Sequence, residues 1–252
     1  MNLLHIARKE LLDYLSSSMF YILLGIFLAL IGFMHWSGVR AFAEYSAQAA
    51  MSGGMDFSLN DLVQNLYEQS EIILTFLIPL MTMRLFSEEQ KSHTLEFLLS
   101  SPASTWDIVL GKFLAALAVF MLMIGATALF PAELALMADM DWGPLATTYL
   151  GFLLLGAGFI SLGMFFSSLT ESQMIAALFG FGGLLLLFLL SWISSTGGDG
   201  GLGFGVGYFS VLERMGAFTK GLIRSQDLVY WITFTGLFLL ATHQRVESLR
   251  YR

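Results

Sequence analysis

The chain has 252 residues, of which 56% are hydrophobic and only 12% are charged, and its formal net charge is −7. Soluble globular proteins carry about 25% charged residues, so this chain has roughly half of the charged surface that a soluble fold would show. It contains no cysteine, which excludes disulfides and thiolate metal sites, and its negative charge argues against a nucleic-acid-binding protein. The composition indicates an integral membrane protein.

Residues 1–18 come before the first long apolar stretch and have the pattern of an amphipathic helix. The apolar residues that share one side of such a helix are Leu3, Leu4, Ala7, Leu11, Tyr14 and Leu15. Ile6 and Leu12 fall outside that side. We expect this helix to lie in the membrane interface with its apolar side toward lipid. A cleavable signal peptide is not expected, because a helical segment rather than a short basic tip precedes the first span.

Six stretches are candidates for membrane-spanning helices. They cover residues 19–37, 64–86, 111–134, 144–169, 173–195 and 227–244. The second has a short uncharged part, between Glu71 and Arg84, so its helix must extend past one of these two residues. Glu68, Glu71 and Glu133 are either wet helix ends or groups that line a pathway, and the sequence leaves both possibilities open. We predict one all-α transmembrane domain over residues 1–252.

An even number of spans places both termini on the same side of the membrane, and the distribution of basic residues selects that side. With cytoplasmic termini, eight basic residues lie inside: Arg8, Lys9, Arg84, Lys91, Lys112, Arg245, Arg250 and Arg252. The remaining four lie outside: Arg40, Arg214, Lys220 and Arg224. The sequence therefore predicts a multi-pass protein of the cytoplasmic (inner) membrane with both termini in the cytoplasm.

The segment Tyr208–Ile223 lies between the fifth and sixth predicted spans. It is apolar at intervals, but it is too short and too charged to cross a bilayer. We predict a re-entrant or interfacial segment before the last span.

Residues 87–110 form a cytoplasmic loop in this topology and have the pattern of two helices with a turn between them. The first helix follows Thr94 and ends before Pro102, because the residue before a proline disfavours the helical conformation. Ser104, with Asp107 three residues later, is typical of a helix N-cap with a capping box. The second helix continues into the third span.

The first of these two helices carries an apolar surface. Leu95, Phe97 and Leu98 are too apolar for a freely solvated loop, so they are expected to dock on the membrane, on the chain's own core or on a partner. Glu96 lies on a different side of the helix, together with Ser92. We expect Glu96 to pair with a cation or a backbone N–H, because burying a lone charge costs several kcal/mol.

One series of residues in and beside this loop has a recognisable order. Its members are Glu88, Glu89, Thr94, Leu95, Glu96, Phe97, Leu98, Leu99, Pro102, Gly111 and Lys112. The series resembles the loop after the second span in the permease subunits of type-2 (ABC-2) ABC transporters, where acidic residues precede Gly-Thr-Leu-Glu, two leucines, a proline and Gly-Lys. His93 stands where the family usually has glycine, which concerns the geometry of the turn before Thr94.

Two other segments extend the resemblance over nearly the whole chain. Phe166-Ser-Ser-Leu-Thr-Glu-Ser-Gln173 is similar to the family's cytoplasmic turn between the fourth and fifth spans, and its candidate site residues are Thr170, Glu171 and Gln173. Tyr208-Phe-Ser and Asp227-Leu-Val-Tyr230 resemble parts of the last external segment of the gliding-motility-associated and nitrous-oxide-maturation permeases.

The resemblance implies a permease subunit that has no nucleotide site and works as a homodimer with two copies of an ABC ATPase subunit. ATP and Mg²⁺ would bind to the ATPase, so we expect no cofactor and no enzymatic activity in this chain itself. The chain indeed has no G-x-x-x-x-G-K-[ST] phosphate-binding motif. Loop 87–110 would couple ATP hydrolysis to export, or to force transmission to periplasmic or other cell-envelope proteins.

A second class of function also fits the sequence: a membrane scaffold or sensor that transports nothing and has no energy source. The residues predict neither a catalytic nor a metal site, since the four histidines, His5, His35, His93 and His243, are far apart along the chain. An ATPase that associates with the chain would distinguish a permease from a scaffold.

Overall fold

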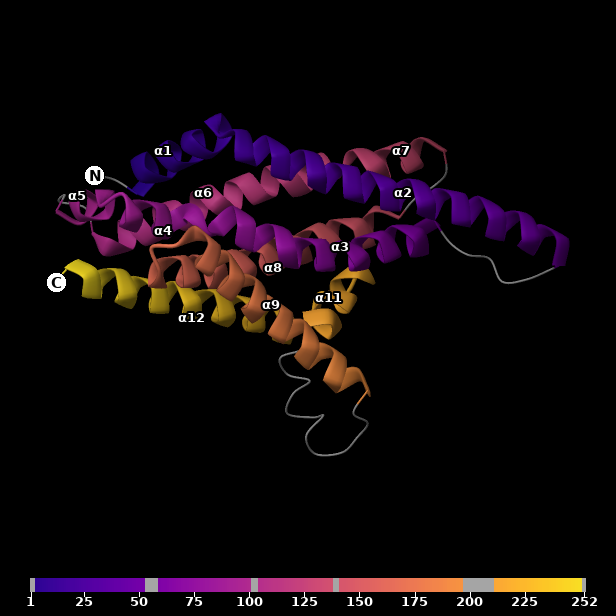
Figure 1. Ribbon diagram of the computed structural model, residues 1–252. Coiled ribbons are helices and arrows are strands. Elements are labelled where there is room, and N and C mark those ends of the chain that lie inside the picture. Colours follow the sequence, from indigo (N-terminus) through magenta and orange to yellow (C-terminus); the bar gives the residue numbers. More distant parts are fainter. Residues whose placement is uncertain (1–2, 53–58, 101–103, 138–140, 197–210, 251–252) are drawn as a thin grey trace.

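A computed structural model describes residues 3–52, 59–100, 104–137, 141–196 and 211–250, and their regular structure is entirely α-helical (Figure 1). This confirms the all-α prediction for the described residues. The first six helices are α1 (Leu3–Ser16), α2 (Ser18–Ser52), α3 (Leu59–Thr82), α4 (Arg84–Lys91), α5 (Thr94–Ser100) and α6 (Thr105–Ala126). The others are α7 (Leu129–Met137), α8 (Trp142–Leu169), α9 (Gln173–Thr196), α11 (Val211–Thr219) and α12 (Ser225–Arg250).

Five helical segments of the described chain are long and apolar enough to cross a bilayer. They are Ser18–Ala47, Gln64–Lys91, Thr105–Leu136, Trp142–Leu169 and Gln173–Trp192. The sixth predicted span, residues 227–244, lies in α12, which has the length but is not among these apolar segments. The molecule is therefore a multi-pass membrane protein, and its sixth span stays a prediction.

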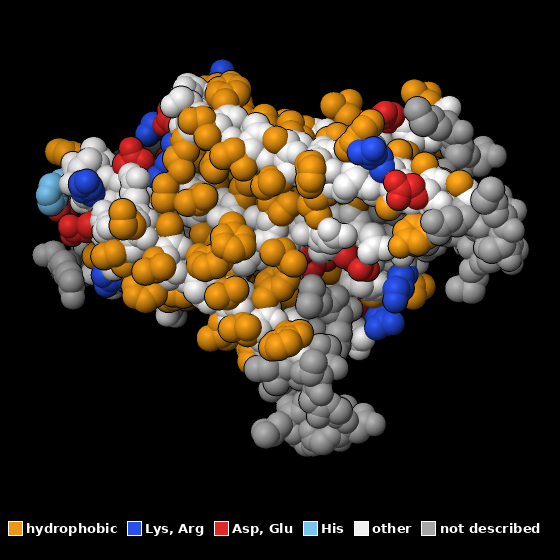
Figure 2. Space-filling model, turned by 45° about the vertical axis from the view of Figure 1, so that its right-hand side comes forward, with side chains coloured by type: hydrophobic (Ala, Val, Ile, Leu, Met, Phe, Trp, Pro, Cys, Tyr) orange, Lys and Arg blue, Asp and Glu red, His pale blue; other side chains and the backbone are white. Residues whose placement is uncertain are grey.

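The surface has the distribution of side chains that a bilayer requires. Figure 2 shows hydrophobic side chains over the middle of the molecule, whereas charged side chains gather mostly toward its two ends. Exposed apolar side chains occur on α2 (Phe33), α9 (Leu178) and α12 (Ile232). Such a broad apolar surface would be insoluble in water, but it is well solvated by lipid.

Helix α8 occupies the centre of the bundle and packs against α3, α6, α9, α11 and α12. Contacts of Gly158 with Trp231 and of Phe165 with Phe238 show that α8 and α12 run in the same direction. Both chain ends lie at the end of the bundle that holds α5, and α7 lies at the opposite end (Figure 1).

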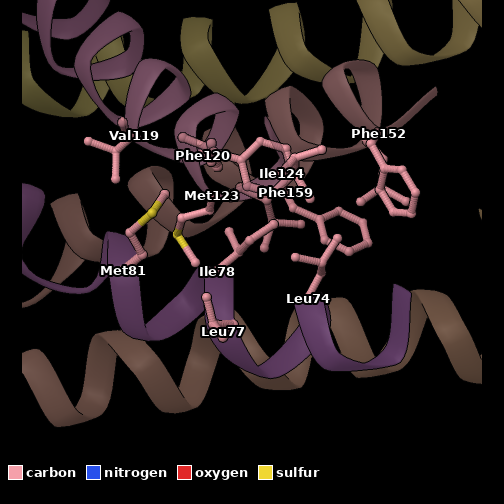
Figure 3. Close-up of a cluster of buried hydrophobic side chains, with 14 of the residues drawn as sticks. Leu74, Leu77, Ile78, Met81, Val119, Phe120, Met123, Ile124, Phe152 and Phe159 are labelled. Carbon is pink, nitrogen blue, oxygen red and sulfur yellow. The ribbon is translucent and has the colours of Figure 1, made fainter. Parts of the chain in front are cut away.

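The core lies where α3, α6 and α8 meet (Figure 3). Ile78 of α3, Phe120 of α6 and Phe159 of α8 are at most 1% exposed. A small residue allows α6 and α8 to approach closely, since a Cβ atom at Gly156 would overlap the ring of Phe120. Close helix contact through glycine is the usual packing mode inside a membrane, where van der Waals contact has to replace the hydrophobic effect.

Two of the predicted spans are interrupted. The segment predicted at 64–86 changes from α3 to α4 at Met83, one turn after Pro79. The segment predicted at 111–134 changes from α6 to α7 around Thr127, whose hydroxyl donates to the carbonyl of Ile124 at 2.6 Å. The expected loop at 87–110 is largely helical in its described part, because it contains the end of α4, α5 and the start of α6.

The side of α1 that faces the bundle contains most of the predicted apolar side, since Tyr14 is buried and Leu11 and Leu15 pack against the core. It is shifted toward Ile6 and away from Leu4. Ile6, which interrupts the sequence pattern, is 2% exposed, whereas Leu4 is 75% exposed. The reason is that α1 packs along α6, so one of its sides contacts protein and another can face lipid. Pro102 and Tyr208, two residues of the predicted motifs, lie outside the described residues.

Candidate coupling site

The α4–α5 segment is attached to the end of α8 by a hydroxyl group. Ser167 Oγ of α8 accepts hydrogen bonds from the backbone N–H groups of Phe86 and Ser87 at 3.1 and 3.2 Å, and it donates to the carbonyl of Met83. The first N–H groups of a helix have no partner inside the helix, so a hydroxyl from another element replaces a local cap. The side chain of Gln90 donates to the carbonyl of Ser168, which fixes the other end of α4.

The turn between α4 and α5 has the geometry that the family pattern implies. His93 has a φ of 57°, in the left-handed region where glycine carries no steric cost. Ser92 supports the turn by donating to the carbonyl of Glu88 at 2.8 Å, and its hydroxyl lies 2.8 Å from that of Thr94. His93 therefore adopts the conformation for which most family members use glycine, at some cost in backbone energy.

Helix α5 has one buried side chain among several exposed ones. Leu95 is 4% exposed and belongs to the chain's own core, and Leu98 is partly buried against that core. Phe97, in contrast, is 78% exposed. Of the three places at which this apolar surface was expected to dock, the chain's own core therefore holds Leu95, and Phe97 remains on the surface. The side chain of Leu99 lies outside the described ones.

Glu96 is not buried within this chain, and its pairing with a cation or a backbone N–H of a partner protein stays a prediction. Its side chain is 82% exposed, and its neighbour is His93, with 3.9 Å between Nδ1 and Oε1. Helix α5 buries Leu95 against the core and leaves the side chain of Glu96 exposed. Exposed pairs of this kind contribute about 0–1 kcal/mol.

The buried charge at this end is Lys112 instead, whose side chain is 1% exposed. Its Nζ lies 2.9 Å from Glu10 Oε1 and 2.8 Å from Glu89 Oε1. The ammonium group also lies 5.4 Å from the centre of the Phe86 ring. Because Glu10 belongs to α1 and Glu89 to α4, one charged group of α6 connects three helices. Removal of Lys112 would leave two partly buried carboxylates without a counter-charge.

A second link joins α1 to the junction of α3 and α4. The hydroxyl of Tyr14 donates to the carbonyl of Met81 at 2.9 Å, and burial raises the pKa of Tyr14, which keeps this donor protonated. The guanidinium of Arg84 lies 4.6 Å from the centre of the Tyr14 ring and donates to Ser17 Oγ at 2.8 Å. Helix α1 therefore contacts Arg84 at the start of α4 and is connected to Glu89 near its end by way of Lys112.

A cleft of about 650 Å³ opens between α1, α4 and α5. Five of the predicted site residues line it: Glu88, Glu89, Thr94, Phe97 and Leu98. The basic groups of its wall come from Lys9, Arg84 and Lys112. The cleft is open and has both charges and an exposed phenyl ring, which suits a protein surface better than a small apolar ligand.

Residues 4–200 match the family described as "ABC-2 family transporter protein". The chain belongs to this family. The matched residues include α4, α5 and the turn between α8 and α9, but they end before α11 and α12. No curated protein matches the chain. Membership confirms the ABC-2 permease predicted from loop 87–110, and it leaves the gliding-motility or nitrous-oxide-maturation subtype as a proposal.

The structure brings the permease's second predicted turn next to the first. Thr170 and Glu171 follow α8 directly, and Gln173 begins α9, which packs against α4. Thr170 Oγ1 accepts a hydrogen bond from the Ser172 N–H at 3.2 Å, whereas Glu171 is exposed. The two segments that the family resemblance identified separately thus form one surface at the α5 end.

The sequence analysis missed the residues that hold this surface together. Glu10 of α1 had no recognisable motif around it, Ser167 was noted only within the segment Phe166–Gln173, and Lys112 only as part of Gly-Lys. A structural reason for that glycine is now evident, because a Cβ at Gly111 would lie 2.8 Å from Ile6 Cγ2 of α1. Gly-Lys is therefore where α1 docks: the glycine gives it room, and the lysine binds its Glu10.

Proposed function

We propose that this permease couples ATP hydrolysis by two copies of a separate ABC ATPase to export, or to force transmission to cell-envelope partners. The observation that carries the proposal is the exposed Phe97 on α5, beside a segment rigidly connected to the bundle. A force applied to α5 would pass through α4 to α1 and α6 by way of Lys112, and to α8 by way of Ser167.

The topology belongs to the same proposal. Helix α12 runs along α8 for much of its length and exposes Val229, Ile232 and Leu237, which favours a sixth span in contact with lipid. Six spans and the location of both termini at the α5 end favour cytoplasmic termini in the inner membrane (Figure 1). Within this topology, α11 is the predicted re-entrant or interfacial segment, and α1 lies at the membrane interface.

Two further parts of the proposal rest on the resemblance to ABC-2 permeases. The permease would act as a homodimer, and the similarity of Tyr208-Phe-Ser to gliding-motility-associated and nitrous-oxide-maturation permeases favours envelope proteins as the partners of its outer side. ATP and Mg²⁺ would be held by the ATPase.

Replacement of Phe97 by Asp tests the coupling surface. Because Phe97 is 78% exposed, the change should leave the fold intact while it places a charge at the centre of the proposed contact. We expect ATPase recovery with the purified permease to fall at least tenfold, measured by mass spectrometry after purification from native membranes. Leu136→Asp is the matched control, since Leu136 is 89% exposed on α7 at the opposite end. Unchanged recovery with Phe97→Asp, or equal loss with both variants, would refute the assignment.

A further inference from the structure

Glu71 is a buried acidic residue inside a membrane-spanning segment. Glu71 is 1% exposed and lies in the segment Gln64–Lys91. It lies seven residues from the start of that segment, which corresponds to about 10 Å of helix. Charged side chains at such a depth are rare in membranes, and those that occur usually serve a function.

The helix geometry directs Glu71 toward protein rather than lipid. Leu74 and Ile78 follow it at helical spacing and are 0% exposed. Figure 3 shows both of them pointing into the core beside Phe152 and Phe159. Helix α3 packs there against α8, α9 and α11.

The carboxyl group of Glu71 has no compensating partner among the described residues. Its Oε2 atom is buried and accepts no hydrogen bond in the described part of the chain. The nearby hydroxyls of Ser70 and Thr75 donate to the backbone carbonyls of Tyr67 and Glu71 itself, at 2.6 and 3.0 Å. The charge that acts on Glu71 is another negative one, that of Glu68 one turn earlier.

In the described structure, the titratable side chains of the helices around α3 are either paired with other residues or exposed. Over Gln173–Thr196, α9 has none. Titratable side chains of the other helices form the pairs Tyr149–Tyr67 (α8), Arg214–Asp227 (α11) and His35–Glu133 (α2). The other charged side chains of α2, Arg40 and Glu44, are exposed. An ionised Glu71 would lose its hydration without gaining a counter-charge, which costs far more than binding a proton.

We propose that Glu71 is a proton-binding site inside the bundle, protonated in the conformation described here. It would ionise only when α3 separates from the helices packed against it and water reaches the carboxyl group. Opening of the bundle at this point would then release one proton per chain, so that higher pH favours the opened form. This inference holds whether or not the permease is coupled to an ATPase.

The first experiment is labelling of the full-length chain in nanodiscs with dicyclohexylcarbodiimide at pH 7. The O–H of a protonated carboxyl adds across one C=N bond of this apolar reagent, so the product contains the whole reagent and nothing is lost. Glu71 should be modified, as detected by peptide mass spectrometry. Glu68, one turn away and exposed, serves as the internal control and should stay unmodified.

The second experiment compares the thermal unfolding of wild type, Glu71→Gln and Glu68→Gln between pH 5 and 9. The folded wild type would hold a proton that the unfolded chain has lost, so its stability should fall relative to Glu71→Gln as pH rises. The expected slope approaches a tenfold change in the folding equilibrium constant per pH unit. Glu68→Gln should keep the wild-type slope.

Each of these measurements can overturn the proposal that Glu71 binds a proton. Equal slopes for wild type and Glu71→Gln would show an ionised Glu71 and overturn the proposal, even if the reagent failed to enter the bundle. Repeating both measurements at fixed pH with Na⁺, K⁺ or Ca²⁺ distinguishes a proton from a metal cation. If any of these ions suppressed labelling or selectively stabilised wild type over Glu71→Gln, Glu71 would be a cation site and the proton assignment would be wrong.

Discussion

The two ends of the bundle each contain a buried basic residue, but the two residues connect different parts of the fold. At the α5 end, Lys112 of α6 binds Glu10 of α1 and Glu89 of α4. At the other end, Arg214 of α11 binds Asp227 of α12, with 2.9 Å between Nη1 and Oδ1. The first cluster joins three helices, whereas the second attaches a short helix to the beginning of the next one.

A glycine accompanies each of these ionic contacts. At the α5 end, Gly111 of α6 accommodates Ile6 of α1. At the other end, Gly151 of α8 accommodates Phe218 of α11, whose Cβ would lie 2.9 Å from an added Cβ. Both ends therefore use the same combination of close backbone approach and a buried ion pair. The difference is that, among the described residues, the combination at the α5 end adjoins the segment that we propose as the coupling surface.

The largest effect is expected from Lys112→Met. The change leaves Glu10 and Glu89 facing each other in a buried site, and loss of one member of such a pair typically costs about 3–5 kcal/mol. Thermal unfolding of the purified permease in detergent measures the loss. Adding Glu10→Gln and Glu89→Gln should recover most of it, because the triple variant buries no charge. A stable Lys112→Met variant would show that water reaches this site and that the three helices are not joined through it.

A somewhat smaller loss is expected from Arg214→Met at the other end. Asp227 is 2% exposed and would lose its counter-charge, at a cost of about 3 kcal/mol. Asp227→Asn in the same chain should restore much of the stability. ATPase recovery should be unaffected in molecules that remain folded, since α11 lies away from α5 (Figure 1). A decrease in recovery equal to that of Phe97→Asp would remove the functional distinction between the two ends.

The smallest effect is expected from Gly111→Ala. The new methyl group would clash with Ile6 and displace α1, at a cost of about 1–3 kcal/mol typical of overpacking. Gly125→Ala on the same helix is the control, because no atom lies within 4 Å of its added Cβ. The difference in unfolding temperature between the two variants measures the contact. Equal temperatures would show that α1 is loosely attached and that Lys112 alone holds it.

Interactions between residues that are close together in the sequence could be predicted from the sequence alone. The capping box at the start of α6 is confirmed, with Ser104 Oγ accepting from the Trp106 N–H and Asp107 accepting from the Ser104 N–H. Its partners lie two and three residues apart, so local backbone geometry is sufficient to form it. The positive φ of His93 was also signalled, because the family pattern has glycine at that position.

Burial within α5 was harder to predict. The pattern of Leu95, Glu96 and Phe97 identified an apolar helix, but it did not show which side meets the core. In the structure Leu95 is buried and Phe97 is exposed, so the two residues have different roles. A helix of seven residues has too few turns for its periodicity to specify an orientation relative to the rest of the protein.

By itself, the sequence determined that this chain is a helical membrane protein of the ABC-2 type, because apolar length and short motifs are properties of contiguous residues. Only the tertiary structure decided which charges are paired and which is not. Lys112 and Glu10 are 102 residues apart and meet because α1 packs on α6. Glu71, by contrast, is buried against helices that offer it no counter-charge in the described residues. The electrostatic state of a side chain depends on what the packing of distant helices places beside it, and no local pattern contains that information.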